Sequence, residues 1–185
     1  GGGNNPTPGG NDNNGGGSSS GGSSSGDSSS AVTTSENKPD QPVIGSVNAS
    51  GKVSDNHAVI IITDSMVKTA IEKAQSDAKA QGKTANGIGA EVSLSAPGAK
   101  SFTIITERAA LDRLVSANVK LFQITGLPVN ICFDQASLKK QQAQGSGDIT
   151  MTLKPVTVKN IRNAYDIALS TVKDGKTVNI TSMGN

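Results

Sequence analysis

The sequence predicts an α+β fold made mostly of β-strands, and three observations support this prediction. Three stretches of the chain repeat one order of features: a β-branched strand, an acidic residue, a helix and a second strand. Several further segments alternate apolar and polar residues, which is the period of a strand with one buried face. The final stretch, NAYDIALSTVKDGKTVNI, is typical of an antiparallel hairpin. We therefore expect about eight strands, arranged as three strand–helix–strand repeats plus a C-terminal antiparallel hairpin.

The first part of the chain, residues 1–42, differs in composition from the rest. Gly, Ser and Asn supply 25 of the first 30 residues, and no large apolar side chain occurs there. Such a segment buries too little surface to offset the entropy of ordering its backbone, so we predict a disordered linker. Residues 43–185 have the usual size of one domain, and we expect a single α+β module there. Nothing in the sequence covers the edge of the last hairpin, which leaves open that the natural protein continues beyond residue 185.

The charge and hydropathy of the sequence argue against a nucleic-acid partner and against a membrane-spanning helix. All 17 basic residues and 13 of the 15 acidic residues follow residue 30, which leaves the folded part with a mild positive excess. Its basic clusters are Lys139–Lys140 and the KNIR around Lys159 and Arg162. No aromatic residues lie between these charges, so they predict solvated faces and argue against a nucleic-acid partner. No apolar run approaches the roughly 20 residues of a membrane-spanning helix. We expect a monomer without a membrane span.

An acidic residue marks the point in each repeat where the first strand meets the helix. The three repeats begin with HAVIIITD, SFTIITER and PVNICFDQ, and the acidic residues are Asp64, Glu107 and Asp134. A carboxylate at this point accepts hydrogen bonds from free amides of the first helical turn and favours the positive end of the helix dipole. We predict this capping role for all three residues. A catalytic set of carboxylates is the alternative.

Helical periodicity predicts three helices, over residues 64–81, 107–117 and 134–144. The first is expected to end at Gly82 and the second at Asn118, a residue that tolerates the left-handed conformation. The predicted buried residues are Val67, Ala70, Ile71, Ala74 and Ala78 in the first helix, Ala110, Leu111, Leu114 and Val115 in the second, and Ala136, Leu138 and Ala143 in the third. The run KKQQAQ makes the third helix too polar for deep burial, so we expect it at the periphery.

The strands are predicted from alternation and from turn signals. Val59–Ile62 is apolar at every position and is expected to be a central strand covered on both faces. Asp174–Gly175 predicts the turn of the last hairpin. The residues expected to share one face of a strand are Val92 and Leu94; Ile149, Met151 and Leu153; Tyr165, Ile167 and Leu169; and Val178 and Ile180. The four aromatic residues, Phe102, Phe122, Phe133 and Tyr165, fall in predicted strands and are expected in the core.

Residues with reactive side chains are few. Cys132 is the only cysteine, which excludes an internal disulfide and a multi-cysteine metal site. We predict a buried structural thiol in the strand VNICF; a reactive nucleophile is the alternative, although the only histidine, His57, is distant in sequence. The Gly–X–Gly of TANGIGAEVS lacks the lysine of a phosphate loop and predicts a turn into the strand at Val92. The sequence therefore indicates no enzyme, with no catalytic, cofactor-binding or metal-ligating residues and no cofactor.

Four segments resemble, in order, a module of Gram-positive, Clostridia-like cell-surface proteins that is found beside S-layer-homology domains. They are TANGIGAEVSLSAP, AALDRLVSANVKLFQIT, FDQASLKKQQAQGSGDITMTLKPV and AYDIALSTVKDGKTVNITSMG. The similarity covers about residues 55–185. It implies secretion, attachment to the bacterial cell envelope and a flexible linker before the module. It implies no catalytic residue, and LPVN at Leu127 departs from the sortase signal LPxTG.

Two functions are consistent with these features. The favoured one is a non-catalytic extracellular structural module that spaces or displays other parts of a bacterial cell-surface protein. The alternative is an adhesion or glycan-binding module whose partners are cell-wall or host glycans or other surface proteins. Its contact loops would be AQGKTANG, residues 80–87, and VTVKNIRN, residues 156–163. A groove lined by polar loops would favour binding, and a smooth surface with only capping carboxylates would favour the spacer. An internal Lys–Asn crosslink beside an acid is also open, and intact mass would show it as a loss of ammonia.

Overall fold

A computed structural model describes residues 41–181 of the chain, which fall within one compact unit, Glu36–Asn185. The predicted linker, residues 1–42, lies outside the described residues except for Gln41 and Pro42, as do residues 182–185. The strands are β1 (Val43–Ser50), β2 (Lys52–Ser54), β3 (His57–Ile62), β4 (Ile88–Ser95), β5 (Ser101–Thr106), β6 (Leu121–Thr125), β7 (Ile131–Asp134), β8 (Ile149–Val158), β9 (Ile161–Lys173) and β10 (Lys176–Asn179). The helices are α1 (Asp64–Ala80), α2 (Arg108–Ser116) and α3 (Gln135–Ala143), with a short 3-10 turn at Thr84–Asn86.

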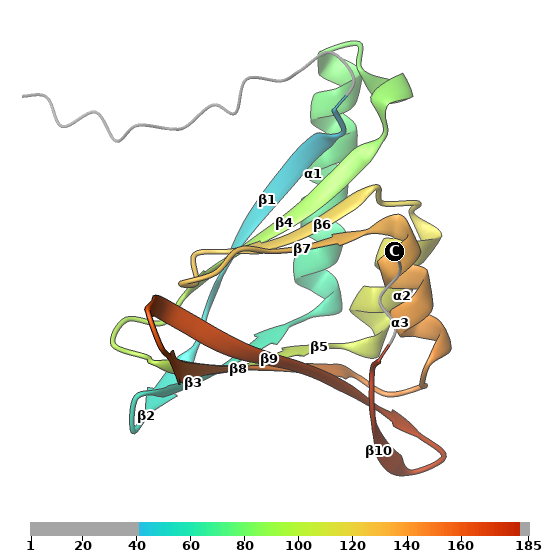
Figure 1. The fold of residues 1–185 in the computed structure, drawn as a ribbon. Helices are drawn as coiled ribbons and strands as arrows, with labels where there is room; N and C mark the ends of the chain where they lie inside the picture. The colour runs from blue at the N-terminus through green and yellow to red at the C-terminus, as the bar shows by residue number, and fades with distance from the viewer. Residues whose placement is uncertain (1–40, 182–185) are drawn as a thin grey trace, which may run out of the picture. The chain divides into compact units, whose positions relative to one another are not determined.

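The strands form two sheets, shown in Figure 1. The smaller sheet has the order β1-β4-β6-β7, in which β1, β4 and β6 are parallel and β7 is antiparallel to β6. The larger sheet has the order β10-β9-β8-β5-β3-β2 and is antiparallel except for the parallel pair β3–β5. The α+β class is therefore confirmed, and the described residues contain ten strands where about eight were expected.

The repeats are present, but each one is divided between the two sheets. In the first two repeats the strand before the helix lies in the larger sheet and the strand after it in the smaller sheet; the third repeat runs the other way. Equivalent strands of the first two repeats pair with each other, β3 with β5 and β4 with β6, both in parallel. The predicted order of strand, helix and strand is present in each repeat, and the arrangement differs in detail because each repeat contributes one strand to each sheet. A single repeat has no partner for its strands, so pairing between repeats satisfies their backbone groups.

Helix α1 packs against β1 and β4 of the smaller sheet. Its buried residues are the five predicted from periodicity: Val67, Ala70, Ile71, Ala74 and Ala78. The contact is closest at Gly45 of β1, where an added Cβ would lie 1.9 Å from the carbonyl oxygen of Ala70. The small residues on both elements thus let the helix backbone approach the sheet closely.

Helices α2 and α3 contact each other, and in Figure 1 they lie at one end of the unit, between the two sheets. Their buried leucines meet the inner faces of both sheets, where Phe122 and Phe133 stack with ring centroids 6.4 Å apart. The predictions for the aromatic residues are confirmed for three of the four, because Tyr165 is only half-buried. The alternation expected for Ile149, Met151 and Leu153 is also confirmed, since all three are buried.

The burial predictions for the strand Val59–Ile62 and for helix α3 are wrong. The strand Val59–Ile62 lies next to the short strand β2 near the edge of the larger sheet, and Val59 and Ile61 are 41% and 48% exposed. Only one face of this strand, the face with Ala58, Ile60 and Ile62, meets the core. No helix of the described residues covers the face with Val59 and Ile61. Helix α3 buries Gln141 together with Leu138, whereas Ala136 and Ala143 are exposed. The helix therefore turns toward the sheets the face with Leu138 and Gln141, and not the face with the two alanines.

The turns follow the residue preferences that predicted them. Gly82 follows α1 with φ of 66°, and Asn118 follows α2 with φ of 53°. Asp174 and Gly175 both have positive φ, as the turn of a two-residue hairpin requires, and Lys173 faces Lys176 across it. The predicted strand after TANGIG is β4.

Candidate functional site

The three acidic residues at the strand-to-helix junctions all bind neighbouring groups, but not all in the predicted way. Asp134 caps its own helix, because its Oδ1 accepts a hydrogen bond from the amide of Ser137 at 2.7 Å. This bond lowers the pKa of the Asp134 carboxyl below its ordinary value. Glu107 makes no cap bond to its own helix α2; its Oε2 accepts from the amide of Asp64 at 2.8 Å, at the start of α1. The capping prediction is therefore confirmed for Asp134. It is wrong for Glu107, which was expected to cap its own helix α2 and instead binds the first amide of α1.

Asp64 does not cap its own helix α1, because Thr63 is the N-cap of α1 and accepts from the amide of Met66. The Asp64 carboxylate binds Arg113 of α2 with two parallel hydrogen bonds, Nε to Oδ1 at 2.5 Å and Nη2 to Oδ2 at 2.6 Å. This bidentate pair joins two helices and lowers the pKa of Asp64, chiefly through the hydrogen bond with Arg113. The same bond raises the pKa of Arg113.

A second cross-element group is centred on Arg108 at the start of α2. The amide of Arg108 donates to Oδ1 of Asp148, at 2.8 Å, in the segment before β8. Its guanidinium donates to Asp112, to the carbonyl oxygen of Gln142 in the last turn of α3, and to that of Gly145 just after the helix. Arg108 thus ties α2 to the end of α3. Sequence reasoning missed Arg108, Arg113 and Asp148, because an arginine on a polar helix face carries no signal of its partner.

An open hollow of about 510 Å³ lies beside these groups and is lined by Asp64, Ala109, Asp112, Arg113, Ser116 and Gln142. Its charged groups are engaged with each other: Asp64 with Arg113, and Asp112 with Arg108 and Gln142. The hollow is formed by side chains on helix surfaces and not by the loops expected to bind a ligand. Its walls already neutralise one another, so a ligand there would compete with bonds that hold the helices together.

The two candidate binding loops take different forms. AQGKTANG contains the end of α1 and the 3-10 turn, and it contributes Thr84 and Gly87 to a surface hollow of about 300 Å³ with Asn118 and Lys120. VTVKNIRN forms the ends of β8 and β9 and the turn between them, so it is a strand hairpin and not a flexible loop. The predicted solvation of the basic clusters is confirmed for Lys139, Lys140 and Lys159, which are exposed; the side chain of Arg162 lies outside what is described.

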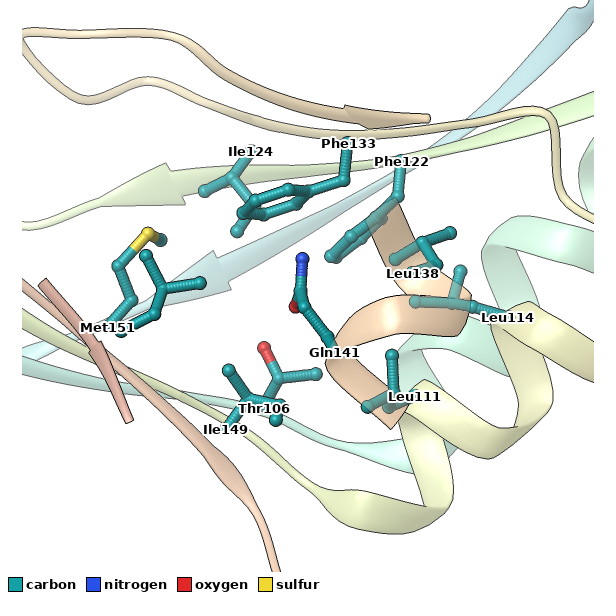
Figure 2. A pocket seen from close by; sticks show the side chains of 11 residues that line it. Thr106, Leu111, Leu114, Phe122, Ile124, Phe133, Leu138, Gln141, Ile149 and Met151 are labelled. Atoms are coloured by element: carbon teal, nitrogen blue, oxygen red, sulfur yellow. The ribbon is translucent and has the colours of Figure 1, made fainter. Parts of the chain in front are cut away.

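A small enclosed cavity of about 10 Å³ lies between α2, α3 and the inner faces of both sheets. Its wall is apolar except for Thr106 and Gln141, and Gln141 is 3% exposed. Figure 2 shows the amide nitrogen of Gln141 directed toward the rings of Phe122 and Phe133. That nitrogen has no hydrogen-bond partner. A cavity of this size is at the lower limit for one water molecule, so it offers no room for an organic ligand.

The two residues of potential nucleophilic chemistry lie on outward faces. Cys132 is exposed on β7 and accepts a weak 3.8 Å contact from Gln123, so the predicted buried thiol is wrong. The period of two explains this, since Phe133 faces the core and its neighbour must face outward. His57 bridges Ser101 at 2.7 Å and Thr103 at 3.0 Å on the neighbouring strand. A base that activates a serine is usually oriented by a carboxylate, whereas the second ring nitrogen of His57 meets a hydroxyl.

No protein-family model, curated protein or solved structure matches the chain. Within residues 41–181 no group of three or more His, Cys, Asp or Glu side chains is placed to hold a metal ion. None of the helices in this part of the chain is long and apolar enough to cross a membrane.

Proposed function

We propose that residues 41–181 form a non-catalytic structural module, one that spaces or displays neighbouring parts of an extracellular bacterial cell-surface protein. The observation that carries this proposal is that the carboxylates at the strand-to-helix junctions are all bonded to other groups of the module. Each of Asp64, Glu107, Asp134 and Asp148 binds an amide or a guanidinium, and three of the four bonds reach a different element. Groups committed to such bonds stiffen the module and are not available to a substrate.

The cell-surface part of the proposal rests on the sequence. The four segments that resemble the envelope module supply part of the core of the unit: they include α3, most of α2 and strands of both sheets, whereas α1, β3 and β5 lie outside them. A residue pattern shared over this part of the core supports a common fold with those S-layer-associated modules. The Gly/Ser/Asn-rich segment before residue 31 fits a spacer between such a module and its neighbour.

Glycan binding is the second candidate, and one observation favours it. The hollow beside Thr84, Gly87, Asn118 and Lys120 combines an amide, a hydroxyl and an ammonium group on the surface, where sugar hydroxyls could find partners. Unlike the hollow beside Arg113, it holds no ion pair that a ligand would have to break.

A ligand screen separates the two candidates. The full chain would be tested on an array of host and cell-wall glycans, and each hit would be followed by thermal unfolding. A glycan held at 100 times its Kd would stabilise the folded state by about 2.7 kcal/mol, and the melting temperature would rise. Such a shift, abolished by Lys120→Glu but kept by Lys139→Glu on the surface of α3, would overturn the spacer proposal. A cooperative unfolding transition that no glycan moves is the expected result.

A further inference from the structure

The exposed aliphatic side chains of the described residues are concentrated on one face. Eight large hydrophobic residues in this part of the chain are exposed, and six of them lie on the side of the larger sheet that faces away from the core. We call this side the outer face; its six exposed aliphatic residues are Val59, Ile61, Val156, Val158, Ile161 and Val172. Their exposed fractions range from 40% to 59%. Val156, Val158 and Ile161 gather at the tip of the β8–β9 hairpin, whereas Val59 and Ile61 lie on β3, beyond Thr103 and Thr152. Exposed apolar patches such as the one at the hairpin mark interaction sites.

The smaller sheet provides an internal comparison. Its own outward positions carry Ser46, Asn48, Ser93, Gln123 and Thr125, which are polar, together with Ile44 and Leu121, which are half-buried. Both sheets have one open face and one face on the core, so exposure alone does not select aliphatic residues. The outer face of the larger sheet differs from it because its aliphatic side chains are exposed.

The hairpin formed by β8 and β9 carries the most exposed part of this face. Register across the hairpin pairs Val158 with Ile161, Val156 with Ala164 and Lys154 with Asp166. All six positions are turned outward, because Leu153 of β8 is buried and side chains alternate from there; a bulge between Val156 and Val158 keeps Ile161 on the same side. Lys154 and Asp166 are exposed, and neither belongs to an ion pair within residues 41–181.

From this arrangement we infer that the outer face of the β8–β9 hairpin binds a second copy of the chain. A twofold axis that runs along the hairpin, between β8 and β9, would place each strand over the other strand of the second copy. Lys154 would then lie over Asp166 of the second copy, and Asp166 over Lys154, while Val158 would meet Ile161 and Val156 would meet Ala164. Opposite charges meet opposite charges and aliphatic groups meet aliphatic groups, so the face is complementary to itself.

The other partners fit this face less well. At the register pair Lys154–Asp166, a polyanion or a polycation would be attracted by one charge and repelled by the other; the exposed Lys159 lies outside this pair, in the turn of the hairpin. Sheets that pack face to face cross at about 30° because each is twisted, which the short hairpin tolerates. The contact is small, so we expect a weak dimer with a Kd of roughly 10–100 µM and not a permanent one. This inference departs from the monomer expected from the sequence and is independent of the proposed function.

Sedimentation velocity of the full chain tests it. Between roughly 5 and 500 µM the weight-average sedimentation coefficient should rise toward that of a dimer. Val158→Asp should weaken the association at least tenfold. Val53→Asp is a matched control, because Val53 is 41% exposed and Val158 40%, both on the larger sheet, but the register turns Val53 to the opposite side. The control should associate like the parent chain.

A charge exchange tests the orientation of the second copy. Asp166→Lys places like charges opposite each other and should weaken the dimer, and adding Lys154→Asp should restore it. Circular dichroism confirms that each variant is folded; if Val158→Asp is not, the charge pair decides alone. A chain that stays monomeric at 500 µM, a control that weakens as much as Val158→Asp, or an exchange that fails to restore association would each overturn the inference. If the chain stays monomeric, the partner of the aliphatic face would have to be a different protein.

Discussion

Replacing Gln141 with methionine should stabilise the protein. Gln141 lies on α3 with 3% of its surface exposed, and its amide nitrogen has no hydrogen-bond partner. Methionine has nearly the same length and shape but no polar hydrogen, so Gln141→Met removes the unmet donor without opening a larger cavity. The surrounding wall is already suited to it, since apart from Thr106 the residues that line this cavity are apolar.

The size of the effect follows from burial. Leaving a buried donor without a partner costs about 1–3 kcal/mol, and the methionine adds apolar contact in its place. Some of this gain is offset because the unbranched methionine chain must adopt a rotamer that fits the space of the forked amide beside the cavity of about 10 Å³. We expect a net gain of about 1–2 kcal/mol. For a folded unit of this size, that raises the melting temperature by about 3–8 °C.

Thermal and urea unfolding of the full chain measure this gain, with the adjacent residue as the control. The amide of Gln142 donates to Asp112 at 2.7 Å, so Gln142→Met removes a bond that is made and should not stabilise. A lower melting temperature for Gln141→Met would refute the reasoning. It would mean that in solution the amide is satisfied, by a single water held with Thr106, because a cavity of this size can just hold one.

The remaining predictions concern the close approach of α1 and the junction carboxylates. Gly45→Ala should cost about 3 kcal/mol in urea unfolding, because its Cβ would lie 1.9 Å from a backbone oxygen; a midpoint like that of the parent would contradict this. Arg113→Met should lower the melting temperature at pH 7. Because the pKa of Asp64 is lowered in the folded state, its stabilisation is complete above the ordinary value of 3.8 and is lost as pH falls through the folded value. The difference between the two proteins should therefore shrink in melts at successively lower pH. Asp134→Ala should destabilise while Asp134→Asn should not in calorimetry, since asparagine caps a helix equally well.

Periodicity alone predicted the helices and most of their buried faces. All five residues expected on the inner side of α1 are buried, and Ala110, Leu111 and Leu114 of α2 are too. These positions are decided locally, because a helix turns through a fixed angle per residue and its apolar stripe must face the core. The third helix shows the limit of this reasoning. Its stripe is weak, so neighbouring elements decide its rotation, and they bury Gln141 where the alanines were expected.

The sequence did not predict which elements pack against each other. The strand Val59–Ile62 has the composition of a strand covered on both sides, and the sequence does not say whether a second layer exists. In the described residues none covers it, and Val59 and Ile61 remain exposed. The mismatch between composition and burial is itself informative. A sequence that keeps aliphatic residues on an open face is consistent with a contact outside the chain, which the inferred dimer supplies only in part, at the hairpin.

The junction carboxylates show why similar repeats need one another. If each acid capped its own helix, each repeat would be satisfied locally and the three could separate without losing those bonds. Instead Glu107 of the second repeat caps the helix of the first, Asp64 of the first binds Arg113 of the second, and Asp148 after α3 caps α2. The parallel pairs β3–β5 and β4–β6 bring these junctions together, so backbone pairing and side-chain bonds connect the same repeats. Loss of one repeat would therefore leave unmet amides and charges in the next, and the unit should unfold as a whole. A module that holds its shape until it fails cooperatively is suited to separating its neighbours by a fixed distance, which is the property that the proposed spacer role requires.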